Sequence, residues 1–71
     1  MANVAKSPVV GTVWKIEVAV GDTVEEDQII MILESMKMEI PIEADEAGTI
    51  AELHVAEGDQ VAEGAVLATL N

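Results

Sequence analysis

Large apolar and polar residues alternate in two separate stretches of the chain. In residues 15–20 and again in residues 52–56, the large apolar side chains occupy every second position, which is the period of a half-buried β-strand. Gly21-Asp22 and Gly58-Asp59 follow these stretches and suit tight turns. No window shows a convincing helical stripe. The pattern therefore predicts an all-β chain.

The two stretches belong to an internal repeat with a constant offset of 37 residues. Residues 11–33 align without a gap on residues 48–70, and nine of these 23 positions are identical. Each copy ends in a short, mainly apolar run, residues 29–33 and residues 66–70, that is typical of a strand with little exposed surface; Thr69 is the one polar residue in these runs. The repeat predicts two interlocking four-stranded halves around a pseudo-two-fold axis, in a flattened eight-stranded barrel-sandwich.

The composition narrows the class of protein. A chain of 71 residues has room for one small domain, so we expect residues 1–71 to form a single unit. Ten Val and seven Ile favour an aliphatic, strand-rich core. The chain has no cysteine and its start lacks a secretory signal, from which we expect a cytoplasmic protein. Its longest apolar run is far shorter than the roughly 20 residues that cross a bilayer.

The chain is strongly acidic. Fourteen Asp and Glu residues against three Lys and no Arg give a formal net charge of -11. This charge repels phosphate backbones and anionic lipid surfaces, so it argues against nucleic-acid and membrane partners. It is compatible either with simple solubility or with steering toward a basic partner protein.

Lys37 stands midway between the two copies of the repeat, within residues 34–39. Turns usually contain Gly, Asn, Asp or Pro, so Met36-Lys37 breaks a local rule at the symmetric midpoint, as functional sites often do. The alternative is one strand with Met36, Met38 and Ile40 directed inward and the lysine solvated. If the two-fold is real, Lys37 and the chain termini lie at opposite ends of the domain.

Other polar and aromatic residues show no catalytic pattern. His54 is the only histidine and lies on the polar register of a strand, so we expect it to be solvated. Because the chain has no cysteine, one histidine gives no reason to predict a zinc site. Ser7 and Ser35 have no evident base, and residues 25–27 predict a charged turn in preference to an acid–base pair. We predict that Trp14, the only aromatic residue, packs in or against the core; the alternative is a contact with a partner.

The residues around Lys37 resemble the attachment motif of the biotinyl domains of biotin-dependent carboxylases, whose usual form is Ala-Met-Lys-Met or Ser-Met-Lys-Met. Residues 11–13, both Gly-Asp turns and Leu33-Glu34 also stand where that family has them, so the resemblance covers essentially the whole chain. The chain most closely resembles the short, free-standing biotin/lipoyl attachment proteins. It lacks an insertion long enough to form the protruding thumb of some bacterial carrier proteins.

This resemblance implies that the chain is a non-catalytic carrier with biotin as its covalent cofactor. A biotin protein ligase would form biotinyl-adenylate from ATP, and Nζ of Lys37 would attack its carbonyl. The biotin arm would then carry CO₂ from a biotin carboxylase to a carboxyltransferase, and we expect the isolated chain to be a monomer. The resemblance also implies that the ligase recognises four neighbouring residues, namely Met36, Met38, Glu34 and Ser35.

Two alternatives remain open. Lipoyl domains share the fold and the central lysine, but their typical motif is Asp-Lys-Ala, so methionine on both sides of Lys37 favours biotin. An unmodified barrel-sandwich module that only mediates protein contacts is an alternative from another class. Loss of the lysine would favour that module, and Lys37 is present.

Overall fold

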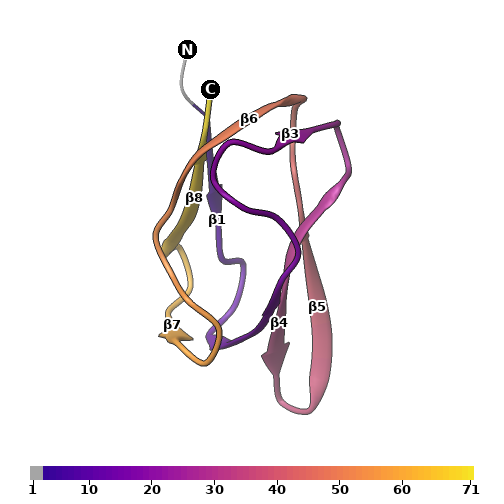
Figure 1. Cartoon of the computed structure of the whole chain (residues 1–71). Coiled ribbons are helices and arrows are strands. Elements are labelled where there is room, and N and C mark those ends of the chain that lie inside the picture. The colour runs from indigo at the N-terminus through magenta and orange to yellow at the C-terminus, as the bar shows by residue number, and fades with distance from the viewer. Residues whose placement is uncertain (1–2) are drawn as a thin grey trace.

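The computed structural model describes residues 3–71. This part of the chain contains eight β-strands. They pair as two antiparallel four-stranded sheets, with the orders β1-β8-β6-β3 and β5-β4-β2-β7 (Figure 1). This arrangement confirms the predicted all-β class and the two four-stranded halves. The strands are β1 (Asn3–Lys6), β2 (Gly11–Ile16), β3 (Thr23–Val24), β4 (Ile29–Ser35), β5 (Met38–Glu43), β6 (Gly48–Leu53), β7 (Gln60–Val61) and β8 (Val66–Leu70).

The two copies of the repeat interlock by exchanging their short strands. The first copy contributes β2, β3 and β4, and the second copy contributes β6, β7 and β8. Strand β3 pairs with β6 of the second copy, and β7 pairs with β2 of the first copy. Each sheet therefore contains strands from both halves of the chain, so neither half completes its sheet alone.

The two Gly-Asp turns have the same structure in both copies. Gly21 and Gly58 have φ values of 96° and 94°, in the left-handed region that glycine enters without steric cost. The side chains of Asp22 and Asp59 each accept a hydrogen bond at 2.9 Å from the backbone N–H three residues earlier. This agreement in backbone and side-chain geometry supports the pseudo-two-fold relation.

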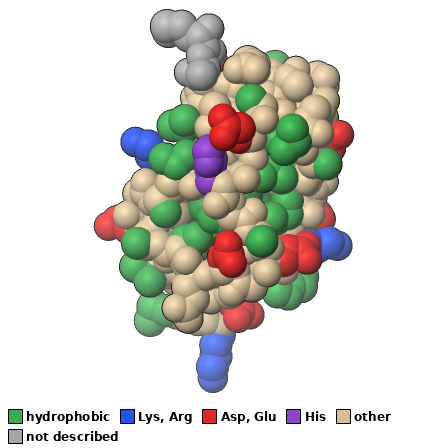
Figure 2. All heavy atoms as spheres, turned by 60° about the vertical axis from the view of Figure 1, so that its left-hand side comes forward, with side chains coloured by type: hydrophobic (Ala, Val, Ile, Leu, Met, Phe, Trp, Pro, Cys, Tyr) green, Lys and Arg blue, Asp and Glu red, His purple; other side chains and the backbone are tan. Residues whose placement is uncertain are grey.

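The pseudo-two-fold also relates the two ends of the molecule. A Cβ atom added at Gly11 would lie 2.6 Å from the Glu34 carbonyl oxygen, and one added at Gly48 would lie 2.5 Å from the Asn71 carbonyl oxygen. Glu34 precedes the β4–β5 turn, whereas Asn71 ends the chain. Figure 1 accordingly places this turn at one end and the C-terminus at the other, as the repeat predicts. At the turn's end, a basic side chain extends into solvent (Figure 2).

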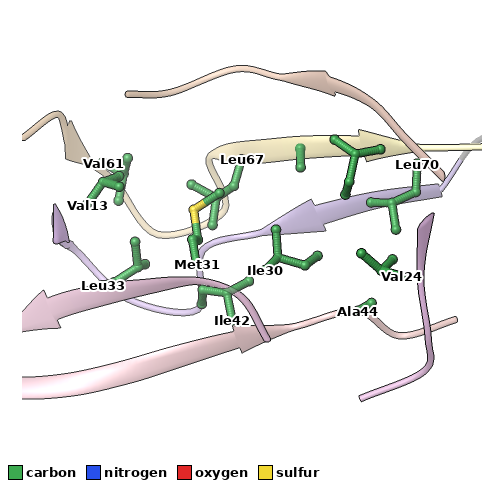
Figure 3. Packing of buried hydrophobic residues seen from close by; sticks show 12 residues of the cluster. Val13, Val24, Ile30, Met31, Leu33, Ile42, Ala44, Val61, Leu67 and Leu70 are labelled. Carbon is green, nitrogen blue, oxygen red and sulfur yellow. The ribbon is translucent and has the colours of Figure 1, made fainter. Parts of the chain in front are cut away.

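Aliphatic side chains from both sheets meet in one core (Figure 3). Burying a Val, Leu, Ile or Met side chain stabilises a fold by about 1.5–3 kcal/mol, so this shared core favours packing of the two sheets against each other. No helix among the described residues has the length and apolar character needed to cross a membrane. The core residues are Val13, Val24, Ile30, Met31, Leu33, Ile42, Ala44, Ile50, Val61, Leu67, Ala68 and Leu70.

Trp14 lies outside this core, so the prediction that it packs there is wrong. Its neighbour Val13 points inward and is 1% exposed, whereas Trp14 is 51% exposed. The register of β2 against β4 also shifts between Val13 and Lys15. Because adjacent side chains of a strand point to opposite faces, the inward Val13 places the indole on the outer surface.

Candidate functional site

Lys37 lies in the two-residue turn that joins β4 to β5. Ser35 and Met38 form the last pair of the hairpin, which leaves Met36 and Lys37 as the two turn residues. Their φ values are 52° and 66°, and positive φ at both positions is the pattern of a type I′ turn. This turn favours Asn and Gly, since the left-handed conformation costs other residues roughly 1–2 kcal/mol each. The backbone is therefore strained at Lys37, the residue exposed on this turn.

The methionines on both sides of Lys37 face solvent. Met36 is 92% exposed and Met38 is 64% exposed, and the Lys37 side chain is exposed between them. The alternative in which both methionines point into the core is therefore wrong. A two-residue turn makes it impossible, because Met36 lies at the corner of the hairpin and not within a strand.

Within residues 3–71, the Lys37 amine makes no ion pair and no side-chain hydrogen bond. In that range the one ion pair joins Lys15 Nζ to Glu17 Oε1, at 3.6 Å. None of the side-chain hydrogen bonds of the described residues involves Lys37. A primary amine on an open turn can therefore be reached by another molecule without first breaking a contact in the domain.

Glu34 and Ser35, which precede the turn, lie in different surroundings. The Glu34 side chain is exposed and stands directly opposite Glu39 on β5. Ser35 is half-buried, and its Oγ donates a hydrogen bond to the Val10 carbonyl oxygen at 2.7 Å. Ser35 therefore ties the hairpin to the segment that connects β1 with β2.

A groove of about 640 Å³ lies beside the turn, between the hairpin and this connecting segment. Its lining is mainly apolar and includes Pro8, Val10, Gly11 and Met36. Val10 is 69% exposed although it is a large aliphatic residue. The sequence pattern does not predict this groove, because residues 8–10 precede the aligned repeat. Extending the offset of 37 residues to this segment would have drawn attention to it.

The remaining predicted residues lie away from the Lys37 amine or serve the fold. His54 is exposed, as predicted, and its Nε2 lies 2.8 Å from Thr69 Oγ1. Residues 25–27 form an exposed turn, which confirms that prediction. Ser7 is buried, and its Oγ donates to the Val9 carbonyl oxygen. Among residues 3–71, no three His, Cys, Asp or Glu residues are placed to hold a metal ion.

Together, the fold and the site define a class: a small β-sandwich module that displays one exposed lysine on a tight turn, at the end remote from its C-terminus. The chain belongs to the biotin/lipoyl family, whose model carries the description "Biotin-requiring enzyme" and matches residues 1–70. Membership of this family agrees with the resemblance of the residues around Lys37 to the attachment motif of biotinyl domains.

The relatives differ widely in length. The chain is 52% identical over 61 residues to the biotin/lipoyl attachment protein of Bacillus subtilis, covering 86% of this chain and 84% of that protein. It is 49% identical over 69 residues to a biotin carboxyl carrier protein of Streptococcus mutans, covering 97% of this chain and 53% of that protein. The solved structure of Kluyveromyces lactis urea carboxylase matches the whole chain at 32% identity with a TM-score of 0.95, although the match covers 6% of that enzyme.

Proposed function

We propose that this chain is a biotin carboxyl carrier domain and that Lys37 is its biotin attachment site. The observation that carries this proposal is the exposed Lys37 in a strained two-residue turn, between the exposed Met36 and Met38. Membership of the biotin/lipoyl family supports the proposal. So do relatives named as a biotin/lipoyl attachment protein and a biotin carboxyl carrier protein.

The surroundings of Lys37 fit covalent attachment of biotin through an amide. The amine lies on an open turn and makes no side-chain hydrogen bond or ion pair within residues 3–71, so acylation disrupts no such contact there. The paired strands β4 and β5 hold the turn at the end of the molecule. When attached, biotin carries CO₂ between a biotin carboxylase site and a carboxyltransferase site. The domain supplies position and tethering, which raise the local concentration of the carried group.

The partners in this proposal are a biotin protein ligase and the carboxylase and carboxyltransferase components of a biotin-dependent carboxylase. Relatives that are parts of carboxylases, such as the urea carboxylase, support the second assignment. We further propose that the chain is a single attachment domain, a monomer in isolation and cytoplasmic. The acidic net charge of -11 suits association with basic protein surfaces.

Lipoate is the second candidate for the group on Lys37, because the family includes both kinds of attachment domain. Methionine on both sides of the lysine favours biotin over lipoate. Both methionines are exposed, so an enzyme that modifies Lys37 can contact them directly. The unmodified interaction module remains the outcome in which neither group is attached.

Intact-mass spectrometry distinguishes these three possibilities. The chain is expressed with a biotin protein ligase and biotin, and in parallel with a lipoate ligase and lipoate. We expect a single biotinyl increment, its loss in Lys37→Arg and its retention in Lys15→Arg, which alters another exposed lysine. A lipoyl increment alone would assign the chain to the lipoyl carriers. No increment under either condition would leave the unmodified module.

A further inference from the structure

Residues 3–71 contain three methionines, and two of them flank Lys37. Met36 is 92% exposed and Met38 is 64% exposed, whereas Met31 is fully buried among the aliphatic side chains of both sheets (Figure 3). The chain builds most of its apolar positions from Val, Ile, Leu and Ala instead. Solvent-exposed thioethers are therefore concentrated in the turn that displays the lysine.

A methionine thioether has a chemistry that aliphatic side chains of similar size lack. Its sulfur can take one oxygen atom from a peroxide, which converts a flexible apolar side chain into a polar, chiral sulfoxide. With hydrogen peroxide, a sulfur lone pair attacks one oxygen, the O–O bond breaks, and the proton left on the attacked oxygen passes to the departing hydroxide. The sulfur loses two electrons, the peroxide gains them, and the products are one sulfoxide and one water.

Solvent access separates these methionines as targets for a peroxide. Met36 lies at the corner of the β4–β5 turn, and Met38 begins β5 beside it, so both are accessible in the folded chain. Hydrogen peroxide is uncharged, so the net charge of -11 does not repel it from this surface. Met31 belongs to a close-packed core and becomes accessible only when the fold opens. The turn is therefore oxidised before the core.

We infer that Met36 and Met38 are reversible oxidation sites that control the attachment of biotin to Lys37, which rests on the function proposed above. An enzyme that acylates Nζ encloses the turn and meets the side chains on both sides of the lysine. A sulfoxide oxygen in this position loses its water when the turn is enclosed, and burial of a polar group without a partner opposes association. Oxidation therefore converts the turn into a poor substrate for acylation.

This control leaves the fold intact. Met36 and Met38 contribute little buried surface, so their oxidation does not disturb the core. The chain has no cysteine, and hence no thiol that responds to peroxide in their place.

The exposed turn also makes the oxidation reversible. Methionine sulfoxide reductases return the sulfoxide to the thioether, and one enzyme acts on each of the two epimers at sulfur. The reduction consumes two thiols and yields a disulfide and water. Attachment therefore stops and resumes without unfolding of the domain.

Cleavage after glutamate makes the oxidation of each methionine measurable by mass spectrometry. The chain is treated with hydrogen peroxide before biotin is attached, because biotin has a thioether of its own, and catalase then removes the peroxide. Residues 35–39 contain both exposed methionines, residues 27–34 contain Met31, and residues 1–17 contain Met1. We expect residues 35–39 to gain oxygen about tenfold faster than residues 27–34. Equal rates in these two peptides would refute selective oxidation of the turn.

Biotinylation of the treated chain by a purified bacterial biotin protein ligase tests the consequence. We expect kcat/KM to fall about tenfold, and to recover after incubation with both methionine sulfoxide reductases and dithiothreitol. Met36→Leu with Met38→Leu keeps apolar side chains of similar volume, so peroxide should not change the kcat/KM of this variant. Met31→Leu is the matched control and should be as sensitive to peroxide as the parent chain.

The outcomes separate this inference from the proposed function. Full biotinylation of the oxidised chain, or a loss that the reductases do not reverse, would refute control by the two methionines while leaving biotin on Lys37. An equal loss in the double leucine variant would do the same. A fall in Tm of the treated chain would assign the loss to damage of the core. Failure of the untreated chain to accept biotin would refute the proposed function, and the control of attachment with it.

Discussion

Met36 and Lys37 hold the left-handed backbone conformation although neither is Gly or Asn. The cost of that conformation is compatible with the marginal stability of a small domain because the strands on both sides are firmly paired. Strain of this kind persists where the surrounding structure determines the backbone. At the residue scale, the display of Lys37 is thus obtained at some expense of stability.

A double substitution in the turn measures that expense. Asn-Gly is the preferred pair for a type I′ turn, so Met36→Asn with Lys37→Gly should raise the free energy of unfolding by about 1–2 kcal/mol. Urea denaturation followed by circular dichroism gives the value. Met36→Asn alone, with the lysine retained, should show part of the gain. A double variant that is less stable than the parent chain would contradict the assignment of strain to this turn.

Met36 and Met38 allow a second test at this scale. Because both side chains are exposed, replacing them with Thr removes little buried surface, and we expect stability to stay within about 0.5 kcal/mol. The same variant should lose about tenfold or more in kcat/KM for biotinylation, since the ligase no longer finds the flanking methionines. Met31→Thr, a substitution in the core, should instead destabilise the domain strongly. Full turnover of the double variant would exclude the methionines as recognition residues.

At the scale of the element, the β4–β5 hairpin carries a pair of like charges. Glu34 and Glu39 lie directly opposite each other, and such pairs destabilise a sheet by about 0.2–1 kcal/mol. Glu39→Gln should therefore raise the free energy of unfolding by that amount at low salt. Glu43→Gln, on the same strand but opposite the uncharged Ile29, is the matched control. Equal effects of both substitutions, or a gain that persists in 1 M salt, would point away from repulsion between the pair.

The hairpin also shows how far the sequence could predict the structure. The alternation and the apolar runs indicate the strands, because one face of each strand must be buried. They do not show where the turn lies. Met36, Met38 and Ile40 occupy every second position whether Met36-Lys37 is a turn or part of one continuous strand. Only the pairing of Ser35 with Met38 shows that the strand ends before the lysine. The groove was missed for a related reason: its connecting segment has no periodicity to interpret.

At the scale of the whole molecule, the repeat was the most informative feature of the sequence. A constant offset of 37 residues predicts the pseudo-two-fold, and the pseudo-two-fold places the β4–β5 turn opposite the C-terminus. The same symmetry could not predict that the Trp14 side chain is exposed, because the equivalent position holds Ala51. A side chain of any size fits the outer face of the sheet at this position. Symmetry determines the backbone, and departures from symmetry mark the surfaces that distinguish the two ends.

The net charge of -11 leads to a prediction for the molecule as a whole. The domain measures 32 × 17 × 17 Å, so at about 0.01 M salt, where the Debye length is about 30 Å, its acidic residues repel one another across the whole fold. At about 0.5 M salt this repulsion is confined to immediate neighbours. We therefore expect Tm to rise by several degrees between these NaCl concentrations, as measured by circular dichroism.

A variant with reduced charge separates screening from a general effect of salt. Glu25 and Glu26 are exposed residues of the charged turn, and replacing both with Gln lowers repulsion without altering the core. This variant should be more stable than the parent chain at low salt and should gain less from added NaCl. KCl should reproduce the NaCl result, because screening depends on ionic strength and not on which cation is present. A Tm that stays flat or falls with salt would mean that contacts between opposite charges outweigh the repulsion among the acidic residues.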